Sequence, residues 1–342
     1  MVNRSTRTEF LLEYPEFNTT EPLFLDDTER AIFRLSSDNR RFLGLHKPVG
    51  VIALMGNGTA EARLDCGAYT DLGTFERRLS AGTGRMFDPA DVICPLLIPD
   101  GGFFQHFLDG VLPKIVQIYD ILRTLRVKLL LNTYRSRSVL DMLHQLDIPE
   151  DMIVFSKVGT VRTDIQLNTC RTPPVHPMLW QRGRQLLLAG VTSPRNYVIL
   201  VVRMRTRNGG RRIVNKKQVI SFLKQRYPQR FQLFAGNLTF TKSRALFSHS
   251  SVVIGCHGGG MYNIHFSQSG TDVVELMPIT GTQTPPAGLS HTVIWRVSGA
   301  LGQRYWRIHS RSLNAKNDVQ LPLDKLKAVL DLIDSSRSNN KG

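Results

Sequence analysis

The sequence has few cysteines and none of the spacings that cysteine-based sites require. Its 342 residues include four cysteines, Cys66, Cys94, Cys170 and Cys256, and no C-x-x-C pair. This absence argues against a zinc ribbon and against a thioredoxin-like site. One or two disulfides are compatible with four cysteines, but the positions alone do not say which residues would pair.

Long hydrophobic runs are also absent. No stretch of about 18 apolar residues occurs, so the sequence offers no membrane span. Residues 1–5 open a polar segment without the apolar core of a signal peptide. The protein is therefore either cytosolic or represented by a sequence that lacks its targeting segment. N-x-S/T sequons begin at Asn3, Asn18, Asn57 and Asn237, which fits the secretory pathway, although such sequons also arise by chance.

Acidic residues are the minority charge, with 28 Asp and Glu against 44 Lys and Arg and a net charge of +16. Such a balance favours an anionic partner, for example nucleic acid, phosphate or an acidic membrane. The 36 residues from Arg195 to Arg230 alone carry 11 Arg or Lys. Because this segment has no interleaved aromatics and no known binding motif, a nucleic-acid-binding protein is the weaker alternative.

What the sequence does contain is an alternation of apolar strands and helical patterns, which is typical of α/β proteins with parallel sheets. In the first half, strands are predicted over 51–54, 92–98, 127–132 and 152–155, and helices over 103–125 and 138–146. In the second half, strands are predicted over 197–202, 231–234, 251–255 and 271–276, and helices over 178–188, 217–226, 242–247, 258–266 and 321–333. Pro113 predicts a kink in the first of these helices.

This alternation predicts two Rossmann-like domains facing a cleft. We expect an irregular segment over residues 1–45, an α/β domain on the acceptor side over 46–172, a nucleotide-sugar-binding α/β domain over 178–320 and a closing helix over 321–334. The proline-rich run from Arg171 to Pro177 cannot lie inside a helix or a central strand, so it is the predicted linker. Ligands of such sheets bind beyond the carboxyl ends of the strands.

The most informative motif is a glycine-rich turn over residues 255–260. A buried strand ends there in four glycines around His257, and a helix is predicted to follow at once. Glycines allow a ligand to approach the backbone, and the free N–H groups of a helix start attract phosphate. The spacing fits neither G-x-G-x-x-G nor the P-loop pattern. The alternative is a tight turn whose glycines serve only packing.

Three further features could carry chemistry. A second buried strand runs into a loop with five arginines over residues 203–212, and arginine matches phosphate oxygens bidentately. His106 and Asp109 are three residues apart on a predicted helix, so they could form a base with an orienting partner. Glu275 ends the strand after the glycine turn, where a carboxylate could accept the hydroxyls of a ribose. Each feature also has a purely structural explanation, namely an exposed basic loop, a satisfied helix end and a surface carboxylate.

Taken in this order, over roughly residues 95–280, these blocks resemble the glycosyltransferase 61 family. The chain thereby resembles the EGF-domain O-GlcNAc transferases, the protein O-mannose β-1,4-N-acetylglucosaminyltransferases and the plant β-1,2-xylosyltransferases. The most specific part is G-x-H-G-x-G-[LM]-x-N at residues 255–263, in which Gly259 replaces the usual alanine. Arg205, Arg212 and Asn215 match the family's arginine run. Glu275 matches its carboxylate strand.

The resemblance implies a two-domain fold of the GT-B type and inverting transfer from a UDP-sugar, GlcNAc or xylose, to a hydroxyl of a protein or glycan. It implies the lumen of the endoplasmic reticulum or Golgi. The sequence has no D-x-D triplet, so no metal cofactor is expected. By this resemblance His106 and Asp109 are the catalytic candidates. The donor site is assigned to Arg203, Arg205, Arg212, Asn215, His257, Gly258, Gly259, Gly260, Asn263 and Glu275.

One departure from the family concerns the acidic partner of His106. Family members often carry it four positions after this histidine, whereas here it is Asp109, three positions after, and Gly110 takes the usual place. A catalytically inactive protein that retains the family fold and binds a nucleotide-sugar is therefore the main alternative.

Overall fold

A computed structural model of the chain divides into two compact units, each described here by itself. Unit 1 comprises Met1–Phe17 and His46–Ala189, and unit 2 comprises Asn18–Leu45 and Gly190–Gly342. The structure describes residues 6–58, 85–86, 91–96, 101–125, 127–132, 136–156, 161–170, 172–173, 175–191, 194–203, 210–286, 291–339. The chain passes from one unit to the other within β2 (Phe17–Thr19), within β3 (Gly44–His46), which pairs with β2, and again after Ala189.

Unit 2 is built on a five-stranded sheet in which all strands are parallel. The strands are β10 (Tyr197–Val201), β11 (Phe231–Phe234), β12 (Ser250–Cys256), β13 (Asp272–Ile279) and β14 (Arg304–Arg311). Their order in the sheet is β11-β10-β12-β13-β14. This is the doubly wound order in which the chain changes direction between its first and third strands, β10 and β12. The predicted Rossmann-like organisation of this half is therefore present.

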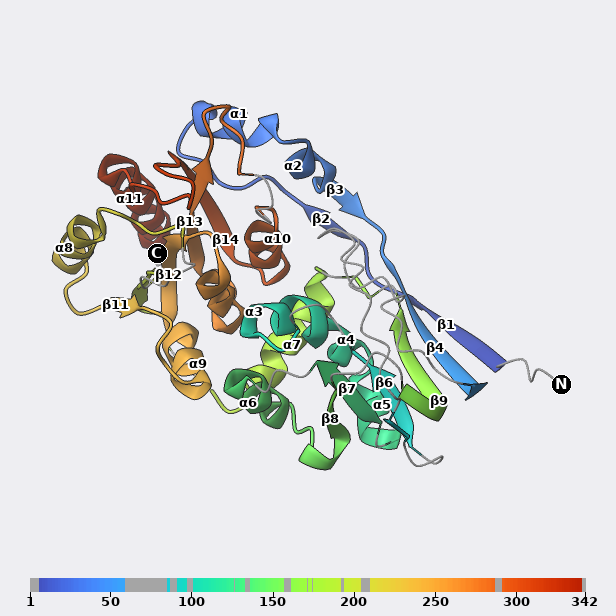
Figure 1. The fold of residues 1–342 in the computed structure, drawn as a ribbon. Coiled ribbons are helices and arrows are strands. Elements are labelled where there is room, and N and C mark those ends of the chain that lie inside the picture. The colour runs from blue at the N-terminus through green and yellow to red at the C-terminus, as the bar shows by residue number, and fades with distance from the viewer. Residues whose placement is uncertain are drawn as a thin grey trace. The chain divides into compact units, whose positions relative to one another are not determined.

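Helices cover both faces of this sheet (Figure 1). They are α8 (Lys216–Arg226), α9 (Phe240–Ser248), the 3₁₀-helix η4 (Gly259–Phe266), α10 (Val293–Ala300) and α11 (Leu323–Asn339). Helices α8 and α11 pack on one face, through a core that includes Leu223, Leu330 and Ile254. Strands β12 and β13 are buried along their whole length, as a parallel strand covered on both faces requires.

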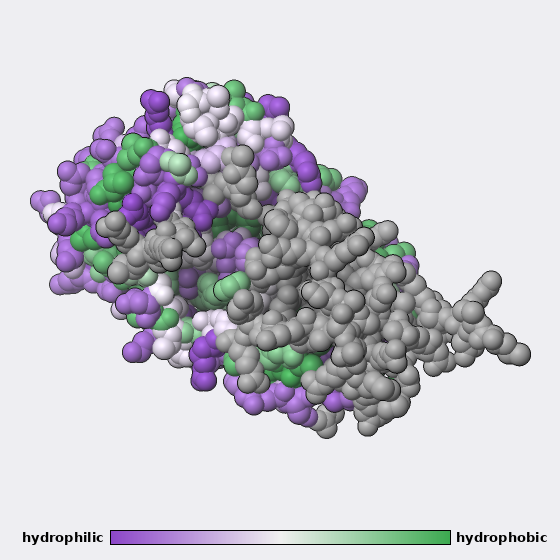
Figure 2. Space-filling view, in the orientation of Figure 1, coloured by the Kyte–Doolittle hydropathy of each residue, from purple (hydrophilic) through white to green (hydrophobic). Residues whose placement is uncertain are grey.

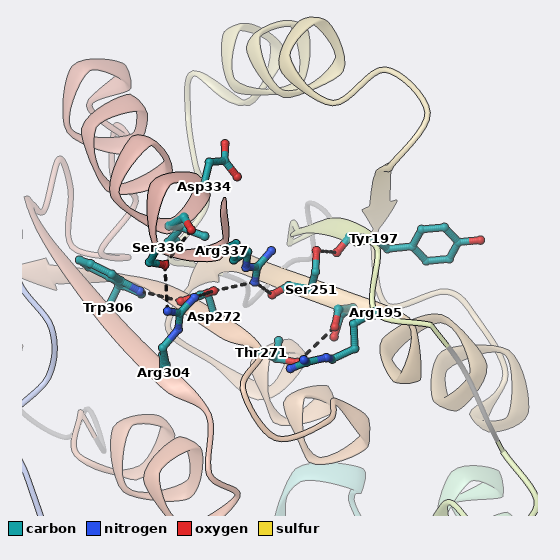
Figure 3. A network of polar contacts seen from close by, with 12 residues as sticks. Arg195, Tyr197, Ser251, Thr271, Asp272, Arg304, Trp306, Asp334, Ser336 and Arg337 are labelled. Carbon is teal, nitrogen blue, oxygen red and sulfur yellow. Dashed lines mark hydrogen bonds and ion pairs between the residues drawn. The ribbon is translucent and has the colours of Figure 1, made fainter. Parts of the chain in front are cut away.

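At the amino end of β13, Asp272 ties α11 to the sheet (Figure 3). Its carboxylate accepts from Arg304 Nη2 and Arg337 Nη2, both at 2.6 Å, and from Trp306 Nε1 at 3.0 Å. Arg337 also donates to the backbone oxygen of Ser251 at 2.5 Å. The positive charges at this edge of the sheet are thus held by an internal carboxylate.

The expectation of an irregular segment over residues 1–45 is corrected by the structure. Residues Thr6–Glu13 form strand β1, and residues 18–45 carry α1 (Asp27–Leu35) and α2 (Ser37–Arg41) as part of unit 2. Asp26 caps α1 by accepting from the backbone N–H of Glu29 at 2.9 Å. The polar surface of α1 hid its buried face in the sequence, because only Glu29 and Phe33 point fully inward.

Unit 1 contains a mixed seven-stranded sheet rather than a purely parallel one. Its strands are β1, β4 (Val49–Gly58), β5 (Arg85–Met86), β6 (Val92–Pro95), β7 (Lys128–Asn132), β8 (Ile153–Ser156) and β9 (Val161–Cys170). The order is β1-β4-β9-β6-β7-β8, with β5 beside β9. Strands β6 to β9 run parallel, whereas β4 is antiparallel to β9 and β1 is antiparallel to β4. The Rossmann-like prediction thus holds only for the parallel part of this unit.

The long helix predicted over 103–125 is broken where Pro113 lies. The pieces are α3 (Phe104–His106), a π-helical turn η2 (Phe107–Val111), α4 (Leu112–Gln117) and α5 (Tyr119–Leu125). In a regular α-helix the ring of Pro113 would clash with the carbonyl of Asp109. The wider turn, in which Leu112 N–H donates to Phe107 O, relieves this clash. The remaining helices are α6 (Arg137–Gln145), the 3₁₀-helix η3 (Glu150–Met152) and α7 (Pro177–Leu187).

The predicted linker is also corrected, because its described residues belong to the interior of unit 1, which continues to Ala189. His176 is buried and donates through Nε2 to Pro15 O at 2.9 Å, while its Nδ1 accepts from Met178 N–H and so caps α7. The prolines of this run therefore mark the turn between β9 and α7 rather than a domain boundary. Arg171 and Pro174 lie outside the described residues.

Candidate functional site

The glycine-rich turn and the arginine loop follow two neighbouring strands of unit 2. Strands β10 and β12 pair in parallel, with Val201 opposite Gly255, so that their carboxyl ends lie at one edge of the sheet. This edge is the point at which the strand order changes direction, where open α/β sheets bind their ligands. The structure thus brings together two motifs that are more than 40 positions apart in the sequence.

Gly258 leaves room for an arginine from the other strand. Its φ is +149°, and a Cβ built on it would lie 2.8 Å from Nη2 of Arg203. The neighbouring glycines serve packing instead, since a Cβ on Gly255 or Gly260 would press into Val201 at 2.9 Å. Both explanations offered by the sequence therefore apply to this turn. Gly255 and Gly260 serve packing, whereas Gly258 leaves room for the side chain of Arg203.

Helix η4 begins directly after Gly258. The first N–H groups of a helix have no acceptor within it, so those of Gly259 and Gly260 are available to an anion. Asn263 donates through Nδ2 to the backbone oxygen of Gly260 at 2.9 Å and so fixes this first turn. Asn263, which was assigned to the donor site, thus acts on the turn itself.

Two arginines form the cationic part of the site. Arg203 is half-buried and donates through Nη1 to Gly210 O at 2.9 Å. Its burial, together with the neighbouring charge of Arg211, lowers the pKa of Arg203 from its ordinary value. No carboxylate among the described residues pairs with either guanidinium. Two like charges held together beside a helix N-terminus make a site for an anion. Arg211 was not among the predicted donor residues.

The other members of the arginine run have structural partners. Arg212 pairs with Asp318 through Nη2 at 2.5 Å, and this hydrogen bond lowers the pKa of Asp318 to about 2. Asn215 donates to Leu321 O at 2.9 Å and accepts from Leu321 N–H at 3.0 Å. Arg212 and Asn215 thus anchor the loop to the C-terminal segment, and their assignment to the donor site stays a prediction. Arg205 lies outside the described residues.

Glu275 is buried rather than open to a ligand. Its carboxylate is 0% exposed, with Oε1 accepting from Nδ1 of His257 at 2.8 Å and Oε2 accepting from the Tyr305 hydroxyl. Burial opposes ionisation of Glu275, but the charge and hydrogen bond of His257, with Arg307 and Tyr305, bring the pKa of this carboxyl below its ordinary value. The predicted ribose contact thus has no exposed oxygen to support it, and Glu275 holds His257 instead.

The catalytic candidates lie in unit 1, at the start of the helix that follows β6. His106 Nδ1 and Asp109 Oδ1 are 3.8 Å apart, which is too far for a hydrogen bond, and the side chains are 32% and 5% exposed. Nδ1 of His106 has no hydrogen-bond partner among the described residues. The spacing of three residues thus places the two side chains near each other. His106 ends α3, and Asp109 lies in the π-helical turn η2 that follows.

The positive charge of the chain belongs to its second half. Residues 190–342 hold 22 Lys and Arg against 6 Asp and Glu, which accounts for the whole net charge of +16. On the face that Figure 2 shows, hydrophilic side chains cover most of the described surface, with apolar ones in small groups. In the part of the chain that the structure describes, no group of three or more His, Cys, Asp or Glu side chains could hold a metal ion.

The fold of unit 2 is that of a doubly wound α/β protein, with two arginines, a glycine turn and a helix start at its switch point, the position at which open α/β sheets bind ligands. Residues 104–274, half of the chain, match the sequence model of the family described as glycosyltransferase 61. The chain belongs to this family. The match begins two residues before His106 and ends one residue before Glu275.

Two solved structures of a bacterial glycosyltransferase are weakly similar. The bacterial iron-containing dodecameric glycosyltransferase TibC from enterotoxigenic E. coli is 15% identical over 56% of this chain and 59% of that chain, with a TM-score of 0.28. The dodecameric iron-containing heptosyltransferase TibC in complex with ADP-D-beta-D-heptose is 15% identical over 55% and 58%, with a TM-score of 0.29. The chain thus spans under two thirds of TibC. No curated protein matches it. Within the described ranges, every helix is too short or too polar to span a bilayer.

Proposed function

We propose that this protein is a glycosyltransferase that moves a sugar, GlcNAc or xylose, from UDP to a hydroxyl of a protein or glycan acceptor, with inversion at the anomeric carbon. The observation that carries the proposal is the position of Arg203 against Gly258, at the N-terminus of η4 and the switch point of the sheet. Membership of the glycosyltransferase 61 family supports the reaction class. The compartment that we propose is the lumen of the secretory pathway.

In the donor site, Arg203 and Arg211 bind the diphosphate together with the N–H groups of Gly259 and Gly260. Arg205 joins them by its match to the family's arginine run. As the bond between sugar and diphosphate breaks, negative charge grows on the leaving UDP. Cations and amide groups that are already in place stabilise this charge, which is often the largest catalytic contribution. We propose that these groups, rather than a metal ion, manage the leaving group.

The base that deprotonates the acceptor hydroxyl is His106 in this proposal, with Asp109 as its neighbour. A two-domain arrangement of the GT-B type would bring unit 1 and its histidine to the donor held by unit 2. The hydroxyl oxygen attacks the anomeric carbon as its proton passes to His106, and UDP departs from the opposite side. The 3.8 Å between His106 and Asp109 has to shorten for Asp109 to orient the base.

The experiment is a thermal-shift screen of UDP-, GDP- and CMP-sugars followed by turnover assays. UDP-GlcNAc or UDP-xylose should raise the melting temperature, and no stabilisation by any of these donors would contradict the proposed donor site. His106→Ala should leave the donor-induced shift unchanged and abolish turnover. His144→Ala, on the exposed surface of α6, is the matched control and should change neither.

The main alternative is a family member that binds the donor without catalysis. It is favoured by the absence of a hydrogen bond between His106 and Asp109. Stabilisation by a UDP-sugar without turnover, for hydrolysis as well as for transfer, would establish it. Binding to arbitrary DNA that weakens steeply with salt would instead point to a nucleic-acid-binding protein.

A further inference from the structure

Four buried side chains form a continuous hydrogen-bonded chain that ends at the glycine turn. Arg307 donates through Nε to the Tyr305 hydroxyl oxygen at 3.0 Å. Tyr305 donates to Oε2 of Glu275, and Oε1 of Glu275 is 2.8 Å from Nδ1 of His257. Tyr305 and Arg307 lie on β14, Glu275 lies on the adjacent strand β13, and His257 directly follows β12. None of the four side chains is needed for the apolar core that α8 and α11 cover.

The direction of every bond in this chain follows from the arginine at its end. A guanidinium has donors and no acceptor, so the Tyr305 oxygen must accept from Arg307. The hydroxyl proton of Tyr305 is then free to point only at Glu275. An ionised carboxylate has acceptors and no donor, so the proton between Glu275 and His257 must belong to His257 Nδ1. These hydrogen bonds therefore fix the tautomer of His257.

The four hydrogen-bonded side chains are buried, so water does not offer them alternative hydrogen-bond partners. Arg307 and Glu275 are both 0% exposed, and an ion in such surroundings is tolerated only when it is paired and hydrogen-bonded. Arg307 also donates through Nη2 to the backbone oxygen of His291 at 2.8 Å and stacks on the ring of Phe33 in α1 at 5.1 Å. The N-terminal segment of unit 2 thus shields Arg307, at the other end of these hydrogen-bonded side chains, from water.

At the His257 end of these hydrogen-bonded side chains, one ring nitrogen is left for a ligand. Nδ1 is occupied by Glu275, and Nε2 has no hydrogen-bond partner among the described residues. His257 directly precedes Gly258, against which Arg203 lies. A neutral ring can accept a hydrogen bond at Nε2 from a sugar hydroxyl, and a protonated ring can donate from Nε2 to a phosphate oxygen.

We propose that Tyr305 and Arg307 are positioning residues that hold His257 with its proton on Nδ1, so that Nε2 is the atom presented to the nucleotide-sugar. The identity of the ligand rests on the proposed function, but the tautomer does not. In this arrangement Tyr305 acts on His257 through Glu275, and Arg307 acts on Glu275 both through Tyr305 and directly by its charge. The hydroxyl of Tyr305 is the hydrogen-bonded link between Arg307 and Glu275.

The direct test is nitrogen NMR of the ligand-free protein labelled with ¹⁵N-histidine, in which ring-nitrogen shifts report the tautomer. His257 is assigned by comparison with His257→Gln. We expect the wild-type ring to carry its proton on Nδ1, the less common tautomer of a free histidine. In Glu275→Gln this signature should be lost. In Tyr305→Phe it should weaken, because the carboxylate loses a donor while the packing of the ring is kept.

A wild-type His257 protonated only at Nε2 would overturn the proposal without any variant. An unchanged His257 spectrum in a folded Tyr305→Phe protein would overturn the part assigned to Tyr305 and Arg307. If Tyr305→Phe does not fold, Arg307→Lys serves instead, since it keeps the charge and alters the donor at Tyr305. UDP affinity should fall about tenfold in Tyr305→Phe. If wild-type protein binds no UDP, the proposed function fails, while the tautomer result still decides the positioning role.

Discussion

Replacing Gly258 by alanine is the sharpest perturbation of the donor site, because it adds one carbon atom and removes no polar group. The Cβ of the alanine would lie 2.8 Å from Nη2 and 3.0 Å from Cζ of Arg203. The guanidinium is the far end of a flexible side chain, so it will move away from the turn rather than distort the backbone. The substitution therefore displaces Arg203 without changing it.

Two magnitudes follow from this geometry. The backbone of Gly258 has φ 149° and ψ −178°, a region confined to glycine, and a residue held there costs about 1–3 kcal/mol of stability. Displacing Arg203 removes a charge-assisted hydrogen bond to the diphosphate, which contributes about 1.5–3 kcal/mol. UDP should consequently bind Gly258→Ala about 10- to 150-fold more weakly.

The assay is calorimetric titration of UDP into the folded variant, with urea denaturation to measure its stability. Gly270→Ala is the matched control, since Gly270 has φ +75° and a Cβ there would lie 2.6 Å from Nη1 of Arg195. Arg195 (Figure 3) precedes β10 at the amino ends of the parallel strands, whereas Gly258 follows β12 at their carboxyl ends. Both variants should lose stability, and only Gly258→Ala should lose UDP affinity. Equal UDP affinity in the two variants would refute the reasoning.

Two further predictions concern stability and pH. The pKa of Asp318 is lowered from 3.8 to about 2 by Arg212, so its contribution is complete above pH 3.8 and is lost as the pH falls towards 2. Acid titrations of stability should show this loss in the wild type and not in Asp318→Asn; identical profiles would disprove it. Burial lowers the pKa of Lys114 from 10.5 to about 8, so that holding its charge destabilises the fold below pH 8. Lys114→Met should stabilise the protein by on the order of 3 kcal/mol at pH 7, with the gain vanishing towards pH 10.5, and a pH-independent effect in urea denaturation would contradict this.

The parts of the fold that are local in sequence were predictable. Strands β10, β11 and β12 lie within one residue of their predicted positions, whereas β13 continues three residues beyond its predicted end, to Ile279. Their apolar residues indicated the strands, and β12 and β13 are buried along their whole length. Strand β14 was missed, since the sequence from Arg304 to Arg311 interrupts its apolar residues with arginines and a histidine. Those same polar residues include Arg307, so the failure to predict the strand also hid the buried chain behind His257.

The candidate site, like the fold, was predictable where its residues are local in the sequence. The glycine turn and Arg203 could be located because each directly follows an apolar strand. The different environments of the loop's arginines could not be predicted: Arg203 and Arg211 lie at the proposed anion site, whereas Arg212 pairs with Asp318. Asp318 lies 106 residues away from Arg212, and nothing in the loop sequence indicates that pairing. Likewise, Glu275 is an ordinary strand-end carboxylate in the sequence, and only packing shows that it is buried against His257 and Tyr305.

The most direct test of the donor site compares UDP with uridine in titrations of the wild type, Arg203→Ala and Arg195→Ala. If Arg203 binds the diphosphate, Arg203→Ala should weaken UDP binding by about tenfold or more and leave uridine binding unchanged. Arg195, at the other end of β10, donates to the backbone oxygen of Ser269, and its loss should affect neither ligand. Wild-type affinity of Arg203→Ala for UDP, or an equal loss for UDP and uridine, would contradict the donor site placed at Arg203 and Gly258.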